Sequence, residues 1–252
     1  MNPNVICDNY LIRIFNVEII IKNKLINLTK LMMMMCKYGY IEGVKTLLMI
    51  GFDPSINDSC AIGYASMGGY VEIVKLLLED NRIDPSIDGK SICLASCCGH
   101  NEVVKLLLTD GRVSPNDIYC KSYDKHDKLH NKLCHALYNT RSIYDIMNVY
   151  LIDDNFYDDV SAIGFAVRNR HIEVVKLLSE NKKFDSSYNH NYEIGYASKN
   201  GYIEIVKLLL MNKKVDPGDR NNYAIRLSSE KGHIKVVKLL LKNKRVAQKY
   251  NK

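Results

Sequence analysis

The most distinct pattern along this chain is a ten-residue motif in which apolar positions surround a narrow polar stripe. The motif reads GYVEIVKLLL at residues 69–78, and similar copies begin at residues 39, 99, 170, 201 and 232. In the 69–78 copy, Glu72 and Lys75 lie on one face of a helix together with the following Glu79, and the remaining positions are apolar. An ordinary surface helix buries only one stripe. Each copy therefore predicts a short helix that other parts of the protein cover on two sides.

A second, shorter helix is predicted immediately before each copy. Small residues recur within it at fixed places, Ala65, Ala95, Ala166 and Ala197, and let two helix backbones approach closely. The Gly that opens most copies is expected to end this helix in a left-handed conformation. Turn-forming sequences rich in Asp, Pro, Ser and Asn, such as residues 84–86, separate successive helix pairs. The predicted unit is therefore helix, tight turn, helix and loop.

The copies follow one another at spacings of 30, 30, 71, 31 and 31 residues. A period near 30 residues is typical of a repeat array, in which each unit buries its apolar surface against its neighbours. The single long spacing has room for one degenerate unit, which we expect at residues 131–155, after a polar insertion at residues 117–128. The predicted fold class is all-α, a solenoid of about seven helix-turn-helix units.

The pattern A-x-x-G-H/Y-x-E-V-V-K-L-L-L resembles the ankyrin repeat, and the array covers roughly residues 31–245. The resemblance implies a solenoid whose concave face binds partner proteins. The chain departs from the family because the usual Thr-Pro-Leu-His opening of the first helix is absent and because the period is shorter than about 33 residues. The Ile-, Lys-, Asn- and Tyr-rich style is also similar to ankyrin arrays of amoeba-infecting giant DNA viruses.

The repeat pattern also predicts the domain boundaries. Residues 1–30 match the repeat poorly, and their apolar segment predicts a helical cap over the first unit, with a separate small domain as the alternative. The methionines at residues 32–35 are interpreted as flexible core filling. The expected ankyrin-repeat domain spans residues 31–252, with units at 31–54, 55–84, 85–114, 131–155, 156–185, 186–216 and 217–247.

Charge and cysteine content bear on the possible ligands of the protein and on the cellular compartment in which it resides. The formal net charge is +7, and the stretch from residue 231 to residue 252 holds eight basic residues and no acidic one. The 8 cysteines show no paired spacing, which favours reduced thiols and an intracellular protein. No signal peptide is expected at the N-terminus. Lys22, Lys24 and Lys30 interrupt the most apolar early stretch, which argues against a membrane span.

The resemblance places candidate partner-binding residues at the two positions before each motif copy, which we term the pair positions. These residues differ between units while their neighbours repeat, as expected where packing does not dictate the residue. Simple exposure to solvent is the alternative interpretation. The pair positions are Lys37 and Tyr38, Met67 and Gly68, Cys97 and Cys98, Arg168 and Asn169, Lys199 and Asn200, and Glu230 and Lys231.

No catalytic grouping or cofactor motif is recognisable, and we expect neither enzyme activity nor a cofactor. One group of residues has the side chains of a zinc site: Cys120, His126, His130 and Cys134. Its spacing matches no established zinc pattern, and ordinary helix-surface side chains are the competing interpretation.

The predicted function is a non-catalytic, monomeric scaffold that binds a partner protein. Nucleic-acid binding by the basic C-terminal end is an alternative, although no aromatic residues are interleaved with its lysines to stack on bases. A substrate adaptor for a ubiquitin ligase is a further alternative, for which the sequence shows no recognisable additional domain.

Overall fold

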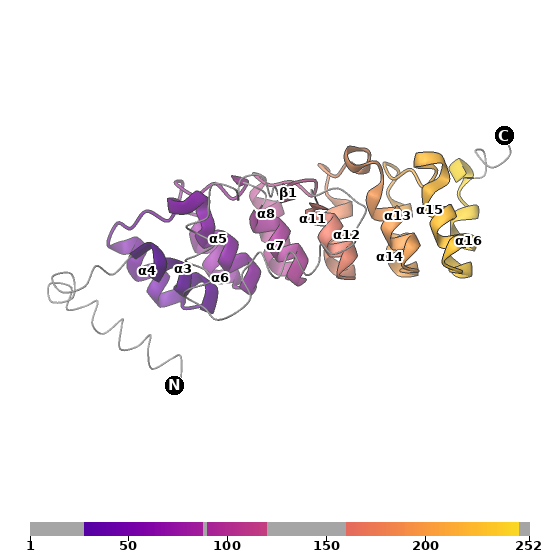
Figure 1. Cartoon of the computed structure of the whole chain (residues 1–252). Helices are drawn as coiled ribbons and strands as arrows, with labels where there is room; N and C mark the ends of the chain where they lie inside the picture. Colours follow the sequence, from indigo (N-terminus) through magenta and orange to yellow (C-terminus); the bar gives the residue numbers. More distant parts are fainter. Residues whose placement is uncertain (1–27, 88–89, 120–159, 247–252) are drawn as a thin grey trace, which may run out of the picture.

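The structure is a computed structural model that describes residues 28–87, 90–119 and 160–246 (Figure 1). Within these residues, helix pairs stack side by side in one elongated row from the indigo to the yellow end of the chain (Figure 1). Two short strands, β1 (Ile118–Tyr119) and β2 (Val160–Ser161), pair in antiparallel fashion beside the helices. The all-α solenoid predicted from the sequence is confirmed.

Each described unit consists of a first and a second helix, as the motif predicted. The first helices are α3 (Leu28–Tyr38), α5 (Ile56–Gly68), α7 (Lys90–Cys98), α11 (Ala162–Arg168), α13 (Tyr192–Lys199) and α15 (Asp219–Glu230). The second helices are α4 (Ile41–Met49), α6 (Val71–Leu78), α8 (Asn101–Asp110), α12 (Ile172–Glu180), α14 (Ile203–Met211) and α16 (Ile234–Leu241). A short 3-10 helix, η3 (Ser186–Asn189), lies in the loop before α13. Helix α3 begins ahead of the boundary expected at residue 31.

The helices are buried against neighbouring helices on two sides, as the sequence predicted. In α7 every residue from Ser91 to Cys97 is buried, and this helix packs against α5 on one side and α11 on the other. In α6 the buried residues are Ile73, Val74 and Leu77. Burying one such side chain contributes about 1.5–3 kcal/mol, whereas an exposed i,i+3 ion pair adds about 0.2–0.5 kcal/mol. Apolar contact between units therefore provides most of the stability.

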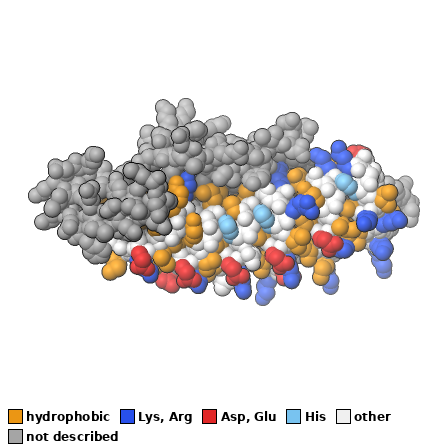
Figure 2. Space-filling view, turned by 90° about the horizontal axis from the view of Figure 1, so that it is seen from below, with side chains coloured by type: hydrophobic (Ala, Val, Ile, Leu, Met, Phe, Trp, Pro, Cys, Tyr) orange, Lys and Arg blue, Asp and Glu red, His pale blue; other side chains and the backbone are white. Residues whose placement is uncertain are grey.

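The polar stripe of the second helices lies along one edge of the row, where acidic and basic side chains alternate in Figure 2. Glu–Lys pairs at N–O distances of 2.7–2.8 Å join Glu42 to Lys45, Glu72 to Lys75 and Glu204 to Lys207. In the last unit the stripe instead carries Lys235 and Lys238 in α16 and Lys242 directly after it, all exposed. The last described unit thus presents a strongly basic outer face.

The units at 85–114 and 156–185 are direct neighbours in the stack. Helices α7 and α8 pack against α11 and α12, and β1 pairs with β2. The side chain of Asn116 accepts from the backbone N of Asp185 at 3.0 Å and donates to its carbonyl oxygen.

The degenerate fourth unit that we expect at residues 131–155 lies outside the described residues, so it stays a prediction. The polar insertion expected at 117–128 begins within the described residues, where Ile118 and Tyr119 form β1 rather than a loop.

The strand pairing leads to a testable prediction about residues 120–159. Tyr119 faces Val160 across the ladder, and the neighbouring Ala162 N donates to Asp117 O at 3.0 Å. An Asn-Gly type I′ turn fits such a hairpin end. Replacing residues 120–159 with Asn-Gly should therefore leave the stack intact, and each halving of the loop saves about 0.6 kcal/mol of closure entropy.

Circular dichroism and thermal unfolding test this deletion. An equal or higher unfolding temperature with the same cooperativity is expected. A large drop in unfolding temperature would show instead that the removed segment supports the contact between α7–α8 and α11–α12.

In four of the described loops, a basic side chain donates a hydrogen bond to a backbone carbonyl group of the preceding unit. These contacts were not predicted from the sequence. The donors and their carbonyl acceptors are Arg112 to Ile83 (2.6 Å), Lys183 to Gly111 (2.5 Å), Lys214 to Phe184 (2.7 Å) and Arg245 to Val215 (2.8 Å). An Asp or Asn precedes each donor by two positions and accepts from its backbone N–H, as Asn243 does for Arg245 at 3.0 Å. The signal in the sequence was this Asp/Asn-x-Arg/Lys pattern, which recurs with the spacing of the array.

Candidate partner-binding surface

The pair positions lie at the C-terminal ends of the first helices, just before a residue in left-handed conformation. That residue is a Gly with φ between 71° and 78° in five of the described units, and Arg170 with φ 60° in the sixth. Because each pair position has the same register in its unit and the units are stacked, the pair positions form one row along the array.

A side chain from the next unit fixes the backbone at this row. The ring Nε2 atoms of His100, His171 and His233 lie 2.9, 2.9 and 3.0 Å from the carbonyl oxygens of Met67, Cys97 and Lys199, respectively. Each His follows the Gly or Arg of its own motif copy, and its ring reaches the preceding unit in the stack. The sequence showed that His or Tyr recurs at the second position of the motif. It did not show that these side chains contact the preceding unit.

The N-terminal half of the row is mainly apolar. Tyr38 is 44% exposed, and Lys37 Nζ lies 5.5 Å from the centre of its ring. Met67 and Cys98 are half-buried. Cys97 is only 3% exposed, so its side chain belongs to the core rather than to the surface that we expected it to form.

The C-terminal half combines arginine with tyrosine. The Nε and Nη2 atoms of Arg168 donate to the phenol oxygen of Tyr192 at 2.9 and 2.6 Å. The guanidinium carbon lies 5.4 Å from the ring centre of Tyr192 and 5.5 Å from that of Tyr196. Burial raises the pKa of Tyr192 to about 12, so the phenol stays neutral at physiological pH. Arg170 lies in the same way 5.0 Å from the ring centre of Tyr202.

Two of the candidate residues use their side chains within the fold. Asn169 Nδ2 donates to the carbonyl oxygens of Phe165 at 3.1 Å and Cys97 at 3.2 Å. Asn200 Nδ2 donates to the carbonyl oxygen of Tyr196 at 2.9 Å. These amides satisfy carbonyls that a helix end otherwise leaves unpaired. Their side chains are therefore occupied in ending helices, and a partner role for the other pair positions stays a prediction.

The end of the row is more accessible. Lys199 is half-buried, and Glu230 and Lys231 are exposed. These residues lie at the C-terminal ends of first helices, whereas Lys235, Lys238 and Lys242 follow the polar stripe of a second helix. The array therefore carries two separate basic surfaces near its C-terminal end, and they can be altered independently.

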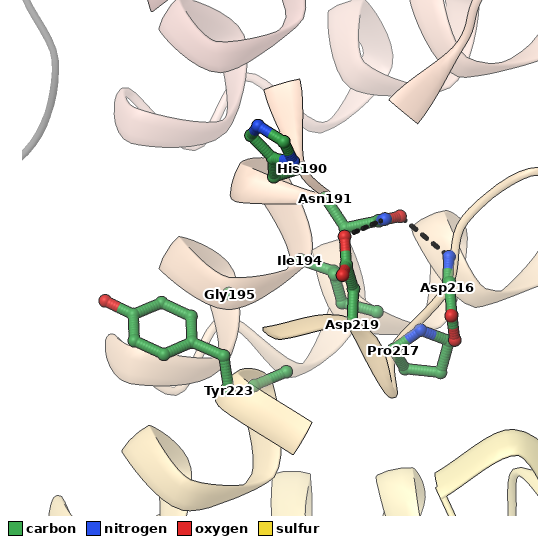
Figure 3. A pocket seen from close by; sticks show the side chains of 9 residues that line it. His190, Asn191, Ile194, Gly195, Asp216, Pro217, Asp219 and Tyr223 are labelled. Carbon is green, nitrogen blue, oxygen red and sulfur yellow. Dashed lines mark hydrogen bonds between the residues drawn. The ribbon is translucent and has the colours of Figure 1, made fainter. Parts of the chain in front are cut away.

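A small pocket lies between α13, the loop that follows unit 186–216 and α15 (Figure 3). Asn191 spans it, because its Nδ2 donates to Asp219 Oδ2 at 2.9 Å and its Oδ1 accepts from Asp216 N at 2.7 Å (Figure 3). The carboxylates also accept local backbone N–H groups, from Arg220 at 2.7 Å and Gly218 at 2.9 Å. These bonds tie one loop to the next.

The described residues show no arrangement suited to metal binding. Within residues 28–87, 90–119 and 160–246, no group of three or more His, Cys, Asp or Glu side chains could hold a metal ion. The zinc candidates Cys120, His126, His130 and Cys134 lie outside these ranges, so that hypothesis stays a prediction. None of the described helices has both the length and the apolar character needed to cross a membrane.

Comparison with known protein families agrees with the fold. A family profile described as ankyrin repeats (3 copies) matches residues 32–118 and 124–221, and the second match includes the expected unit at 131–155. The crystal structure of the human ASB11 ankyrin repeat domain aligns with 17% sequence identity and a TM-score of 0.41, covering 83% of this chain and 96% of that one. No curated protein sequence matched. Because the profile covers most of its length, the chain belongs to the ankyrin-repeat family.

Proposed function

We propose that this chain is a non-catalytic scaffold that binds a partner protein through the row of pair positions. The observation that supports the proposal is the contrast within each first helix. The carbonyl groups at Met67, Cys97 and Lys199 are held by histidines of the next unit, while the side chains at the same positions vary along the array. Such a row presents different side chains from a fixed backbone, which limits the entropy lost on binding.

Family membership supports the same function, because ankyrin repeats generally mediate protein–protein interaction. An interface of standard size would bury about 1,200–2,000 Å² in total. The same proposal includes an intracellular partner, on the ground of the unpaired cysteine spacing, and a host protein as that partner, on the ground of the virus-like sequence style. The protein is proposed to bind as a monomer.

Selection from a displayed library of random peptides tests this function. Binders selected on the natural chain are compared on two variants with matched charge changes. The first replaces Arg168, Lys199 and Glu230 with Ala, and the second replaces Lys176, Lys207 and Glu204 with Ala on the second helices. We expect the first variant to bind the selected peptides about tenfold more weakly, since a few residues carry most of the energy of an interface. Equal binding to both variants would contradict the proposal.

A further inference from the structure

The two halves of the row differ in charge. Among the pair positions of units 156–185, 186–216 and 217–247, Arg168, Lys199 and Lys231 are basic and only Glu230 is acidic. Basic side chains also gather over the C-terminal end of the molecule in Figure 2. The pair positions of the first three units add only Lys37 to the charge of the row. The C-terminal half therefore presents a positive surface that is distinct from the apolar N-terminal half.

Arg168 is a cation of this half whose position is fixed by several contacts. Its guanidinium is held by the Tyr192 hydroxyl at 2.9 and 2.6 Å and lies against two tyrosine rings. A planar guanidinium that is already fixed loses less entropy when it binds a carboxylate than a flexible one does. The geometry therefore favours Arg168 as an anchor for an anionic group.

The tyrosines do not favour nucleic acid as the ligand. Binding of single strands relies on aromatic faces on which bases stack. Here the guanidinium groups of Arg168 and Arg170 cover faces of Tyr192, Tyr196 and Tyr202 at 5.0–5.5 Å from the ring centres. The aromatic groups thus serve to position cations, which suits recognition of carboxylates.

We propose that the C-terminal half of the row, from α11 to α15, binds an acidic peptide segment of the partner, with its carboxylates on Arg168, Lys199 and Lys231. This proposal rests on the proposed function and specifies the chemistry of the partner. Neighbouring packed helices lie about 8–10 Å apart, and a polyproline II segment advances about 9 Å in three residues. An extended segment with an acidic residue at every third position therefore matches the spacing of the units.

Two synthetic peptides test the proposal, one of Glu-Pro-Pro repeats and one of Gln-Pro-Pro repeats. Fluorescence anisotropy measures the binding of each labelled peptide to the full chain, and a single-stranded oligothymidylate is measured alongside. The Glu peptide should bind, and the Gln peptide should bind at least about tenfold more weakly, because three charge pairs are lost. Comparable binding of the two peptides would overturn the proposal.

Matched variants then locate the site. Replacing Arg168, Lys199 and Lys231 with Gln should weaken binding of the Glu peptide by about tenfold or more. Replacing Lys235, Lys238 and Lys242 with Gln removes the same charge from α16 and should change binding by less than about twofold. Equal losses would reveal unspecific charge attraction. If Arg168→Gln disturbs the fold, Lys199→Glu with Lys231→Glu keeps Arg168 in place and should still abolish binding.

The remaining outcomes separate this proposal from the proposed function. If the selected library peptides lose binding when the row is altered but carry no acidic residues, only the proposal of an acidic partner segment is refuted. Library peptides that do not need the row would refute the proposed function. Oligothymidylate that binds more tightly than the Glu peptide, and that loses binding in the Arg168, Lys199 and Lys231 variant, would assign the surface to nucleic acid instead.

Discussion

Replacing Glu193 with Gln is expected to stabilise the fold by about 3 kcal/mol at about pH 8 and by much less at about pH 5. Glu193 lies in α13 at a place where other first helices have Ala61, Ala162 or Ala224. It is 3% exposed. One carboxylate oxygen, Oε1, accepts from Ser161 Oγ at 3.1 Å, and Oε2 has no hydrogen-bond partner among the described residues. A buried carboxylate with one oxygen unpaired is costly to ionise.

The sign of the pH dependence follows from the direction of the shift. Burial raises the pKa of Glu193 from 4.5 to about 7. The folded protein therefore binds this proton more tightly than the unfolded chain does. The stability contributed by the protonated group is fully present below about pH 4.5 and is lost as the pH rises to about 7. Gln keeps the neutral shape of the side chain and removes the loss.

Urea unfolding at a series of pH values measures this effect. The difference in unfolding free energy between Glu193→Gln and the natural chain should grow with pH up to about pH 7 and then level off. Glu230→Gln is the matched control, because it makes the same change at an exposed position at the end of the neighbouring first helix. A difference that is the same at every pH would mean that Glu193 ionises as freely in the folded protein as in the unfolded chain.

The helices were predictable from the sequence because their signal is local and is repeated in each unit. The apolar positions of α6, for example, lie within one ten-residue motif, and every copy supports the same interpretation. Which units touch was not predictable in the same way. The contact between α7 and α11 joins residues that are far apart in the chain. The spacing of 71 residues between two motif copies does not by itself predict which helices are in contact.

The candidate surface was predictable only in part, for a similar reason. Position in the repeat placed Arg168 and Lys199 correctly at the ends of first helices. It could not show that Asn169 bonds to Cys97 O and Phe165 O, because an Asn at a helix end pairs as readily with water as with a carbonyl. The loop cations such as Arg245 were missed because a basic loop residue ordinarily faces solvent, and its carbonyl acceptor belongs to another unit.

Gly201→Ala is expected to destabilise the array by about 2–5 kcal/mol, through two separate causes. Gly201 has φ 71°, a conformation that costs an L-residue about 1–2 kcal/mol. An added Cβ would also lie 2.6 Å from Nδ1 of His233, whose ring is fixed by the Lys199 carbonyl at 3.0 Å. Overpacking of this kind costs about 1–3 kcal/mol. Unfolding by urea or heat, followed by circular dichroism, measures the sum.

Gly232→Ala separates the two causes. Gly232 has nearly the same backbone conformation, φ 73°, but an added Cβ there would meet no atom of the described residues within 4 Å. This variant should lose only the conformational part, about 1–2 kcal/mol. The double variant Gly201→Ala with His233→Ala should lose less than the sum of its single changes, since removing the ring also removes the clash. If Gly201→Ala and Gly232→Ala proved equally destabilising, the ring of His233 would not hold the two units together, and the fixed backbone on which the proposed surface depends would need another cause.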